Sequence, residues 1–379
     1  MANNVLFLVH GIGQHGEKWA EAEDGPITAL EASVKQYPYF SGKKLSDLVD
    51  LVPIRYDDIF DRILETWADL AKGITENAGA ISKQAITDTL THLGKMGDDK
   101  NTFLRYGGDV ILYRGFKLFA QRVQIRVITT IAEVITKKLK QPSPTPVRFS
   151  ILAHSMGTAV IHDALHHLGT ENWLSGGDSY AYQEDSEHVK AELQQVRTAA
   201  AGLTNPFGPD VFRFDTLFML ANTSALLHTT KPSPYESIVR PGTGGHQSSY
   251  VSSYCNIEHE LDPVPKVGRF RMPDVWKQFG GGFDITDLDH IYEYNIHSFA
   301  HYLKHPKVHL RVLTALINAY EPSQGDLDRL SDFPKWGGQF KEPNVMLREK
   351  LRNILSENPD LNSVMSMIKA YQALRELKG

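Results

Sequence analysis

Short runs of consecutive apolar residues recur along the chain and are typical of strands buried on both faces of a parallel sheet. These runs cover residues 5–9, 50–55, 147–152, 214–221 and 250–257. Between and after them, apolar residues recur every three or four positions, which predicts helices. The predicted helices lie at 59–70, 81–93, 127–139, 157–168, 186–198, 308–320, 345–355 and 361–377. The pattern predicts an α/β fold with a mostly parallel sheet flanked by helices.

One segment between predicted strands is far longer than an ordinary crossover connection. Residues 59–140 contain no convincing strand pattern, and we interpret them as a helical insertion that caps the sheet. The core then comprises residues 1–58 and 141–379. The alternative is that the helices of this segment pack on the outer face of the sheet.

Ser155 stands where the strand at 147–152 gives way to a helix that ends near Gly169. The residues two positions before and after it, Ala153 and Gly157, are small, as a sharp strand-to-helix turn requires where two backbones nearly touch. Such a turn presents a serine hydroxyl at the carboxyl end of the sheet. A small-x-Ser-x-Gly string alone arises by chance. The flanking strand and helix support the prediction that Ser155 is a nucleophile.

A glycine-rich loop follows the first predicted strand, with the sequence HGIGQHG at residues 10–16. Backbone N–H groups in such a loop can stabilise the negative oxygen that forms when a serine attacks a carbonyl carbon. We predict Ile12 N–H as one donor, with Gly13 or Gln14 as alternatives. The other predicted donor is the N–H of Met156, the residue after the nucleophile.

The predicted substrate contacts lie around these donors. They are His10, Gly11, Gly13, Gln14 and His154. The glycine spacing of the loop also fits the phosphate-binding loop of a dinucleotide site. His10 and Gln14 are not typical of such a site, and the turn at the serine favours an acyl-transfer site instead.

A serine hydroxyl becomes a good nucleophile when a base takes its proton and an acid orients that base. Asp262 is the predicted acid, because it lies just past the strand at 250–257 and a Pro-Val-Pro sequence makes its loop stiff. Glu258 is expected to lie still within the strand. Asp215 stands at the start of its strand, which is the wrong end of the sheet.

Histidines are frequent after residue 289, where the base is expected. They are His290, His297, His301, His305 and His309. His297 is the predicted base, because it precedes the start of a helix at Ser298 and so lies in a loop. His301, one helical turn further on, and then His290 stay open as alternatives.

Two patterns in the same region could suggest metal sites. His297 and His301 have the spacing of a zinc-binding pair, but no glutamate stands between them as in His-Glu-x-x-His. Asp284, Asp287 and Asp289 lack the glycine and glutamate of a calcium-binding loop and predict a solvated acidic turn. We therefore predict no metal at the site.

Four motifs together resemble the α/β-hydrolases of the lipase and esterase type. They are His10-Gly11-Ile12-Gly13, Ala153-His154-Ser155-Met156-Gly157, Asp262-Pro263-Val264-Pro265, and His297-Ser298 with Tyr302-Leu303. The resemblance covers the sheet-forming parts and leaves 59–139 and the residues past 307 unaccounted for. Ala153 replaces the usual glycine, as in some lipases.

The resemblance implies the α/β-hydrolase fold and hydrolysis of carboxylic esters through an acyl-serine intermediate, with no cofactor. The expected substrate is a small-molecule or lipid ester. An acyltransferase or a thioesterase would use the same triad and stays open as an alternative. A homologue that binds a ligand without catalysis is the alternative from another functional class.

Composition narrows the choice of partner and compartment. The chain has 379 residues and a net charge of -5, which does not favour a nucleic-acid surface. Its one cysteine, Cys255, excludes an intramolecular disulfide and fits a reducing compartment, so we expect a cytoplasmic protein. We expect no signal peptide, and no apolar run approaches the length of a membrane span. Nothing in the sequence indicates the oligomeric state.

Overall fold

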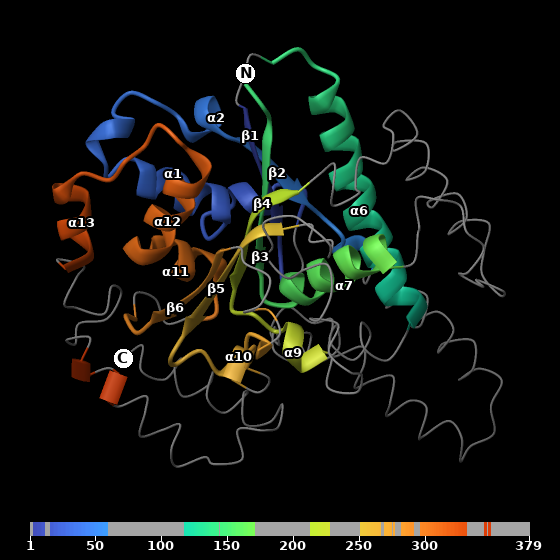
Figure 1. Cartoon of the computed structure of the whole chain (residues 1–379). Helices are drawn as coiled ribbons and strands as arrows, with labels where there is room; N and C mark the ends of the chain where they lie inside the picture. The colour runs from blue at the N-terminus through green and yellow to red at the C-terminus, as the bar shows by residue number, and fades with distance from the viewer. Residues whose placement is uncertain are drawn as a thin grey trace.

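The computed structural model of the chain is shown in Figure 1. It describes residues 3–11, 16–59, 117–143, 145–170, 213–227, 251–266, 269–274, 276, 282–291, 296–331, 345–346 and 348–349. These residues form one six-stranded sheet in the order β2-β1-β3-β4-β5-β6, in which all neighbouring strands are parallel. The strands are β1 (Asn4–Val9), β2 (Asp50–Ile54), β3 (Arg148–His154), β4 (Phe214–Leu220), β5 (Val251–His259) and β6 (Gly282–Leu288).

The helices of the described residues vary from single turns to a long helix of six turns. They are η1 (Trp19–Glu21), α1 (Pro26–Val34), η2 (Pro38–Phe40), α2 (Leu45–Leu48), α6 (Lys117–Leu139), α7 (Met156–Thr170), α9 (Ser224–Leu227), α10 (Pro263–Lys266), α11 (Phe299–Lys304), α12 (Pro306–Leu316) and α13 (Gln324–Ser331). The predicted α/β class, with a parallel sheet and flanking helices, is confirmed.

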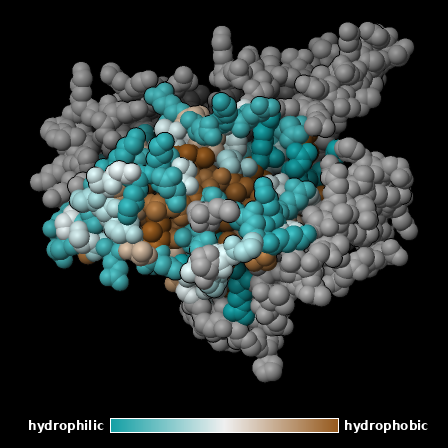
Figure 2. Space-filling view, turned by 90° about the horizontal axis from the view of Figure 1, so that it is seen from above, coloured by the Kyte–Doolittle hydropathy of each residue, from teal (hydrophilic) through white to brown (hydrophobic). Residues whose placement is uncertain are grey.

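The sheet lies between two helical layers, and the pleat of β1 explains why. Successive side chains of a strand point to opposite faces. Val5, Phe7 and Val9 belong to the core beneath α6 and α7, whereas Leu6 and Leu8 belong to the core beneath α1, α11 and α12. Figure 1 shows these two helical layers on either side of the sheet. Figure 2, seen from above, shows hydrophobic residues gathered centrally and hydrophilic residues around them.

Five of the six strands match the predicted apolar runs, and β6 was not predicted. The prediction of a solvated acidic turn is wrong for Asp284 and Asp287, which lie within β6. In this strand only Phe283, Ile285 and Leu288 are large and apolar, so no continuous run marks it. β6 is an edge strand of the described sheet, and Ile285 is 49% exposed there. Pro53 likewise lies in an edge strand, β2, where a missing N–H is tolerated.

The end of the predicted insertion belongs to the core rather than to a separate layer. Residues 117–139 form α6, which packs against α7 and buries Val127, Ile131 and Ile135 in the core on that face of the sheet. Residues 117–139 therefore pack on the outer face of the sheet, which is the alternative to a cap over the sheet. Residues 60–116 lie outside the described residues, and so do the predicted helices at 81–93, 186–198 and 361–377.

The strand order locates the crevice where a ligand is expected. The chain passes from β1 to β2 on one side of β1 and then continues from β3 to β6 on the other side. In open parallel sheets ligands bind outside the carboxyl ends of the strands, where this order reverses. Here the reversal lies between β1 and β3, so Gly11 and Ser155 emerge beside each other. No helix among the described residues is long and apolar enough to cross a membrane.

Candidate active site

Ser155 occupies the turn between β3 and α7 in a backbone conformation that few non-glycine residues adopt. Its φ angle is 54°, in the left-handed region. The surrounding backbone holds this conformation, because Ser155 N–H donates to Leu220 O at 3.0 Å on the neighbouring strand. Strain of this kind is concentrated at functional sites. The predicted sharp turn is therefore present at the predicted residue.

Two glycines allow β1 and its loop to approach this turn. A Cβ on Gly157 would lie 2.4 Å from His10 O, and a Cβ on Gly11 would lie 2.7 Å from the Cβ of Ser155. Neither distance is compatible with a side chain, so both positions require glycine for close approach. The loop after β1 thus begins directly against the Ser155 side chain.

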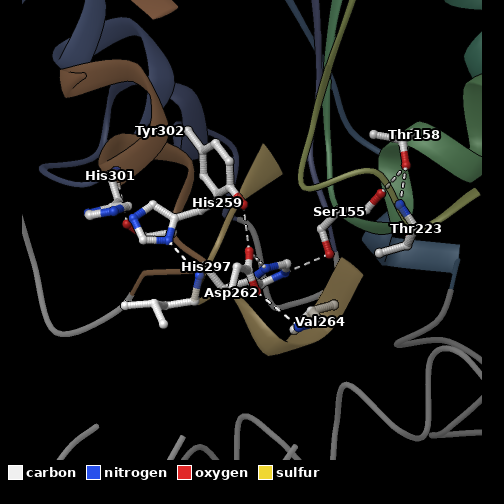
Figure 3. Close-up of polar contacts among 11 residues, drawn as sticks. Ser155, Thr158, Thr223, His259, Asp262, Val264, His297, His301 and Tyr302 are labelled. Carbon is white, nitrogen blue, oxygen red and sulfur yellow. Dashed lines mark hydrogen bonds and ion pairs between the residues drawn. The ribbon is translucent and has the colours of Figure 1, made fainter. Parts of the chain in front are cut away.

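A buried threonine connects the turn at Ser155 to the turn after β4. Thr158 Oγ1 donates to Ser155 O at 2.6 Å and accepts from Thr223 N–H at 3.0 Å (Figure 3). Thr158 N–H also donates to Ser155 O at 2.9 Å. The side chain of Thr158 is fully buried. It therefore ties the carbonyl of the strained residue to a second strand end.

Asp262 lies three residues past the end of β5, at the same edge of the sheet as Ser155. Its N–H donates to His259 O at 3.1 Å, and its Oδ1 accepts from Val264 N–H at 3.0 Å in α10. The carboxylate is fully buried. An ion without solvent is stable only when hydrogen-bonded, and the turn supplies the first of these bonds.

His297 lies between Ser155 and Asp262 and contacts both. Its Nδ1 is 2.8 Å from Asp262 Oδ2, and its Nε2 is 2.8 Å from Ser155 Oγ (Figure 3). An ionised carboxylate only accepts, so Nδ1 carries the proton and Nε2 accepts from the serine hydroxyl. This arrangement can transfer a proton from Oγ to Nε2 while the carboxylate stabilises the resulting imidazolium.

The environment of Asp262 favours its anion despite the burial. Burial alone raises the pKa of this carboxyl, but the charge of His297 and hydrogen bonds from His297, Tyr302 and Val264 lower it to about 2. Burial first, and then the neighbouring carboxylate, raise the pKa of Tyr302 well above its usual value. Asp262 is thus an anion and Tyr302 a hydrogen-bond donor across the neutral range.

The alternative bases point elsewhere. Ser298 caps α11 by accepting from His301 N–H at 3.0 Å, so His297 precedes the helix and His301 lies within it. His301 is buried against the ring of His259, with ring centroids 5.2 Å apart. His290 is also buried, and its carbonyl oxygen is 3.0 Å from His259 Nε2. His297, by contrast, is hydrogen-bonded to both Ser155 and Asp262.

Of the two predicted oxyanion donors, Met156 is among the residues that the structure describes. Met156 is the first residue of α7, and the first N–H groups of a helix have no carbonyl partner within that helix. Its position beside Ser155 suits the predicted role. Ile12 lies outside the described residues, as do the alternatives Gly13 and Gln14. Gly11 is the last described residue before them.

His10 and His154 are buried and belong to a row of contacting aromatic rings that ends at His297. The ring contacts run in the order Tyr56, His10, Trp19, Phe299, His154 and His297. His10 stacks on Tyr56 with centroids 4.1 Å apart, and His154 lies 4.9 Å from His297. These contacts support the loop after β1 and the ring of His297. Substrate contact by His10 and His154 stays a prediction.

No group of three or more histidine, cysteine, aspartate or glutamate side chains in the described part of the chain is arranged to hold a metal ion. Both ring nitrogens of His297 already have protein partners, so the pair with His301 does not form a chelate. Cys255 is buried in β5, and burial raises the pKa of its thiol to about 11, which suits a core residue rather than a nucleophile.

Comparisons of the chain with protein-family models, with curated proteins and with solved structures find no match. The assignment of the site therefore depends on its geometry and its chemistry.

Sequence reasoning missed two side chains that support this geometry, Tyr302 and Thr158. Tyr302 was noted only as part of a motif, and its OH donates to Asp262 Oδ2 at 2.7 Å. A signal for Thr158 was present, because it lies three residues after the predicted nucleophile, in the first turn of the helix that follows it. At that spacing a threonine can bond back to the preceding turn. Nothing local marks Tyr302, whose partner is 40 residues earlier.

Proposed function

We propose that the chain is a serine hydrolase of the α/β-hydrolase type that cleaves carboxylic esters. The observation that supports this most directly is the continuous hydrogen-bond chain from Ser155 through His297 to Asp262. Its members come from three separate segments, after β3, after β5 and after β6. Nucleophile, acid and histidine follow one another in this order in α/β-hydrolases.

In the proposed reaction His297 Nε2 takes the proton of Ser155 as Oγ bonds to the ester carbonyl carbon. The N–H groups of Met156 and Ile12 stabilise the oxyanion, and Asp262 stabilises the imidazolium. The bond from carbon to the alcohol oxygen then breaks, and the alcohol leaves with the proton of His297. Water adds to the acyl-serine with the same help from His297, releasing the acid and restoring the serine hydroxyl.

Burial of the site supports this chemistry. Ser155 is 1% exposed and the side chain of His297 is 18% exposed. In surroundings with little water, charges and hydrogen bonds act more strongly on the developing oxyanion and imidazolium. We further propose that the substrate is a small-molecule or lipid ester, that residues 60–116 contribute a cap, and that the single buried cysteine reflects a cytoplasmic location.

An assay with p-nitrophenyl esters of increasing acyl length tests the proposed activity. The wild-type chain should hydrolyse at least one of them, and Ser155→Ala should lower kcat by about 10³-fold or more. Ser150→Ala is the matched control, because Ser150 is buried within β3, the strand that leads to the turn at Ser155. Equal rates in Ser155→Ala and wild type would contradict the proposal. An added alcohol that yields a new ester would identify acyl transfer.

A further inference from the structure

The oxygen of Asp262 that orients the histidine accepts a second hydrogen bond. Oδ2 is 2.8 Å from His297 Nδ1 and 2.7 Å from the hydroxyl of Tyr302, which donates to it. The other oxygen, Oδ1, accepts from Val264 N–H. The bond between Asp262 Oδ2 and His297 belongs to the proposed serine-histidine-aspartate triad. The bond from Val264 N–H to Oδ1 belongs to the turn after β5. The bond from Tyr302 belongs neither to the triad nor to this turn.

We infer that Tyr302 is a positioning residue of this site, whose hydroxyl fixes the orientation and the charge of the Asp262 carboxylate that faces His297. The inference rests on the proposed function. Tyr302 does not touch the reacting atoms and acts through Asp262.

The placement of Tyr302 suits this role. It lies on α11, one turn into the helix whose preceding residues carry His297, so one short segment supplies both partners of Oδ2. In Figure 3 the hydroxyl of Tyr302 points at the carboxylate of Asp262. Tyr302 and Asp262 are both fully buried. Between two donors on Oδ2 and one on Oδ1, the carboxylate has no freedom to rotate away from His297.

The hydroxyl also shares the negative charge of Oδ2. A hydrogen bond to a carboxylate favours the charged form, and the donor takes part of the charge that otherwise acts on the imidazole. Tyr302 stays protonated across the working range because burial and the neighbouring carboxylate raise its pKa. Loss of the hydroxyl should therefore leave more negative charge facing His297 and stabilise the imidazolium.

Other titratable groups surround Tyr302 and Asp262, and a substitution of Tyr302 alone leaves these side chains in place. Those that face Asp262 or Tyr302 are His154, Glu258, His259, His297 and His301. Replacing only the tyrosine hydroxyl leaves each of them in place.

The chain offers a matched control for this substitution. Tyr320 is also buried, and its hydroxyl donates to an aspartate oxygen, Asp326 Oδ2, at 3.3 Å. Asp326 lies in the first turn of α13, and the ring of Tyr320 packs against Tyr37, Tyr39 and Phe40. Tyr320→Phe therefore removes a buried tyrosine-aspartate hydrogen bond that has no part in the proposed site.

The test compares Tyr302→Phe with Tyr320→Phe in the full chain, using the ester that the wild type hydrolyses best. Tyr302→Phe should lower kcat about tenfold or more, because the Asp262 carboxylate is then no longer fixed in the orientation that holds the His297 ring against Ser155, with KM changed less than about twofold. The acidic midpoint of the pH profile of kcat/KM should move up by about half a unit. Tyr320→Phe should change neither quantity.

Two outcomes would overturn the inference while leaving the proposed function intact. One is a Tyr302→Phe variant with wild-type kcat and an unmoved pH profile. The other is a loss of kcat equal in both variants with no movement of the midpoint, because a general loss of folded protein has that result. A wild-type chain without Ser155-dependent activity would instead refute the proposed function, so the two failures are distinguishable.

Discussion

At the scale of single residues, the site depends on hydrogen bonds that give each side chain one protonation state. Asp262 is an anion in a buried position because three donors surround it. That anion fixes the proton of His297 on Nδ1 and leaves Nε2 facing Ser155 Oγ. Ser155 itself has a left-handed backbone conformation, which few residues other than glycine adopt.

The choice between His297 and His301 as the base leads to a direct prediction. His297→Gln should lower kcat by about 10³-fold or more, because it removes the ring nitrogen that we propose takes the proton of Ser155. His301→Gln should keep most of the activity, because that ring is buried against His259. The measurement is steady-state hydrolysis of one ester by both variants, with circular dichroism as a check of folding.

The opposite ranking, with His301→Gln inactive and His297→Gln active, would contradict the assignment of the base. Sequence alone could not decide between these histidines, since residues four apart on a helix share one face. In the structure Ser298 caps α11, so His297 precedes the helix and lies within hydrogen-bond distance of Ser155 Oγ, whereas His301 lies within the helix.

At the scale of elements, the turn between β3 and α7 is held by bonds to its neighbours. Ser155 N–H is bound to the end of β4, and the Ser155 carbonyl is bound to Thr158, which also receives Thr223 N–H. These bonds keep Ser155 in its left-handed conformation. A substitution that breaks them should therefore affect catalysis as well as stability.

Thr158→Val tests this role, because it keeps the shape of the side chain and removes both hydrogen bonds of Oγ1. We expect it to lower the free energy of unfolding by about 1–3 kcal/mol and to lower kcat severalfold. Thr158→Ser keeps the hydroxyl and should stay close to wild type. Urea denaturation and ester hydrolysis measure the two effects, and equal behaviour of the valine and serine variants would count against the role.

The elements that could be predicted are those with a strong local signal. β1 is a run of five apolar residues, and the turn at Ser155 carries small residues on both sides, so both were found. β6 was missed because aspartates and a threonine separate its apolar residues at the edge of the sheet. Tyr302 was missed because its role depends on a contact between distant segments. Local patterns predict elements, whereas contacts across the fold need the structure.

Across the whole molecule, several histidines are buried in the part of the chain that the structure describes, among them His290, His305 and His309. Burial lowers the pKa of His290 and His309 to about 4 and that of His305 to about 3. These side chains are therefore neutral in the folded chain at pH 7. In the unfolded chain each titrates near its ordinary pKa of about 6.5.

Stability should consequently fall on acidification. Below pH 6.5 the unfolded chain binds more protons than the folded one, so the free energy of unfolding decreases as the pH falls towards 4. Each of these three histidines should contribute a loss on the order of 1–2 kcal/mol between pH 7.5 and pH 5. Urea denaturation at the two pH values measures the sum.

His305→Asn is the informative variant for this effect. His305 caps α12 by accepting from Lys307 N–H, and asparagine is also a favoured cap residue. The variant should therefore keep the cap and lose less stability than wild type between pH 7.5 and pH 5. If both chains lose the same amount, the lowered pKa of His305 does not contribute to acid sensitivity.

Covalent labelling tests whether Ser155 is an activated nucleophile, as we propose. The folded chain is treated with a long-chain fluorophosphonate and, separately, with small phenylmethanesulfonyl fluoride, and the modified peptide is identified by mass spectrometry. We expect at least one reagent to modify the peptide that contains Ser155, and we expect no label in Ser155→Ala and little in His297→Gln. A folded wild-type chain that neither reagent modifies, or a label that persists in Ser155→Ala, would contradict the account.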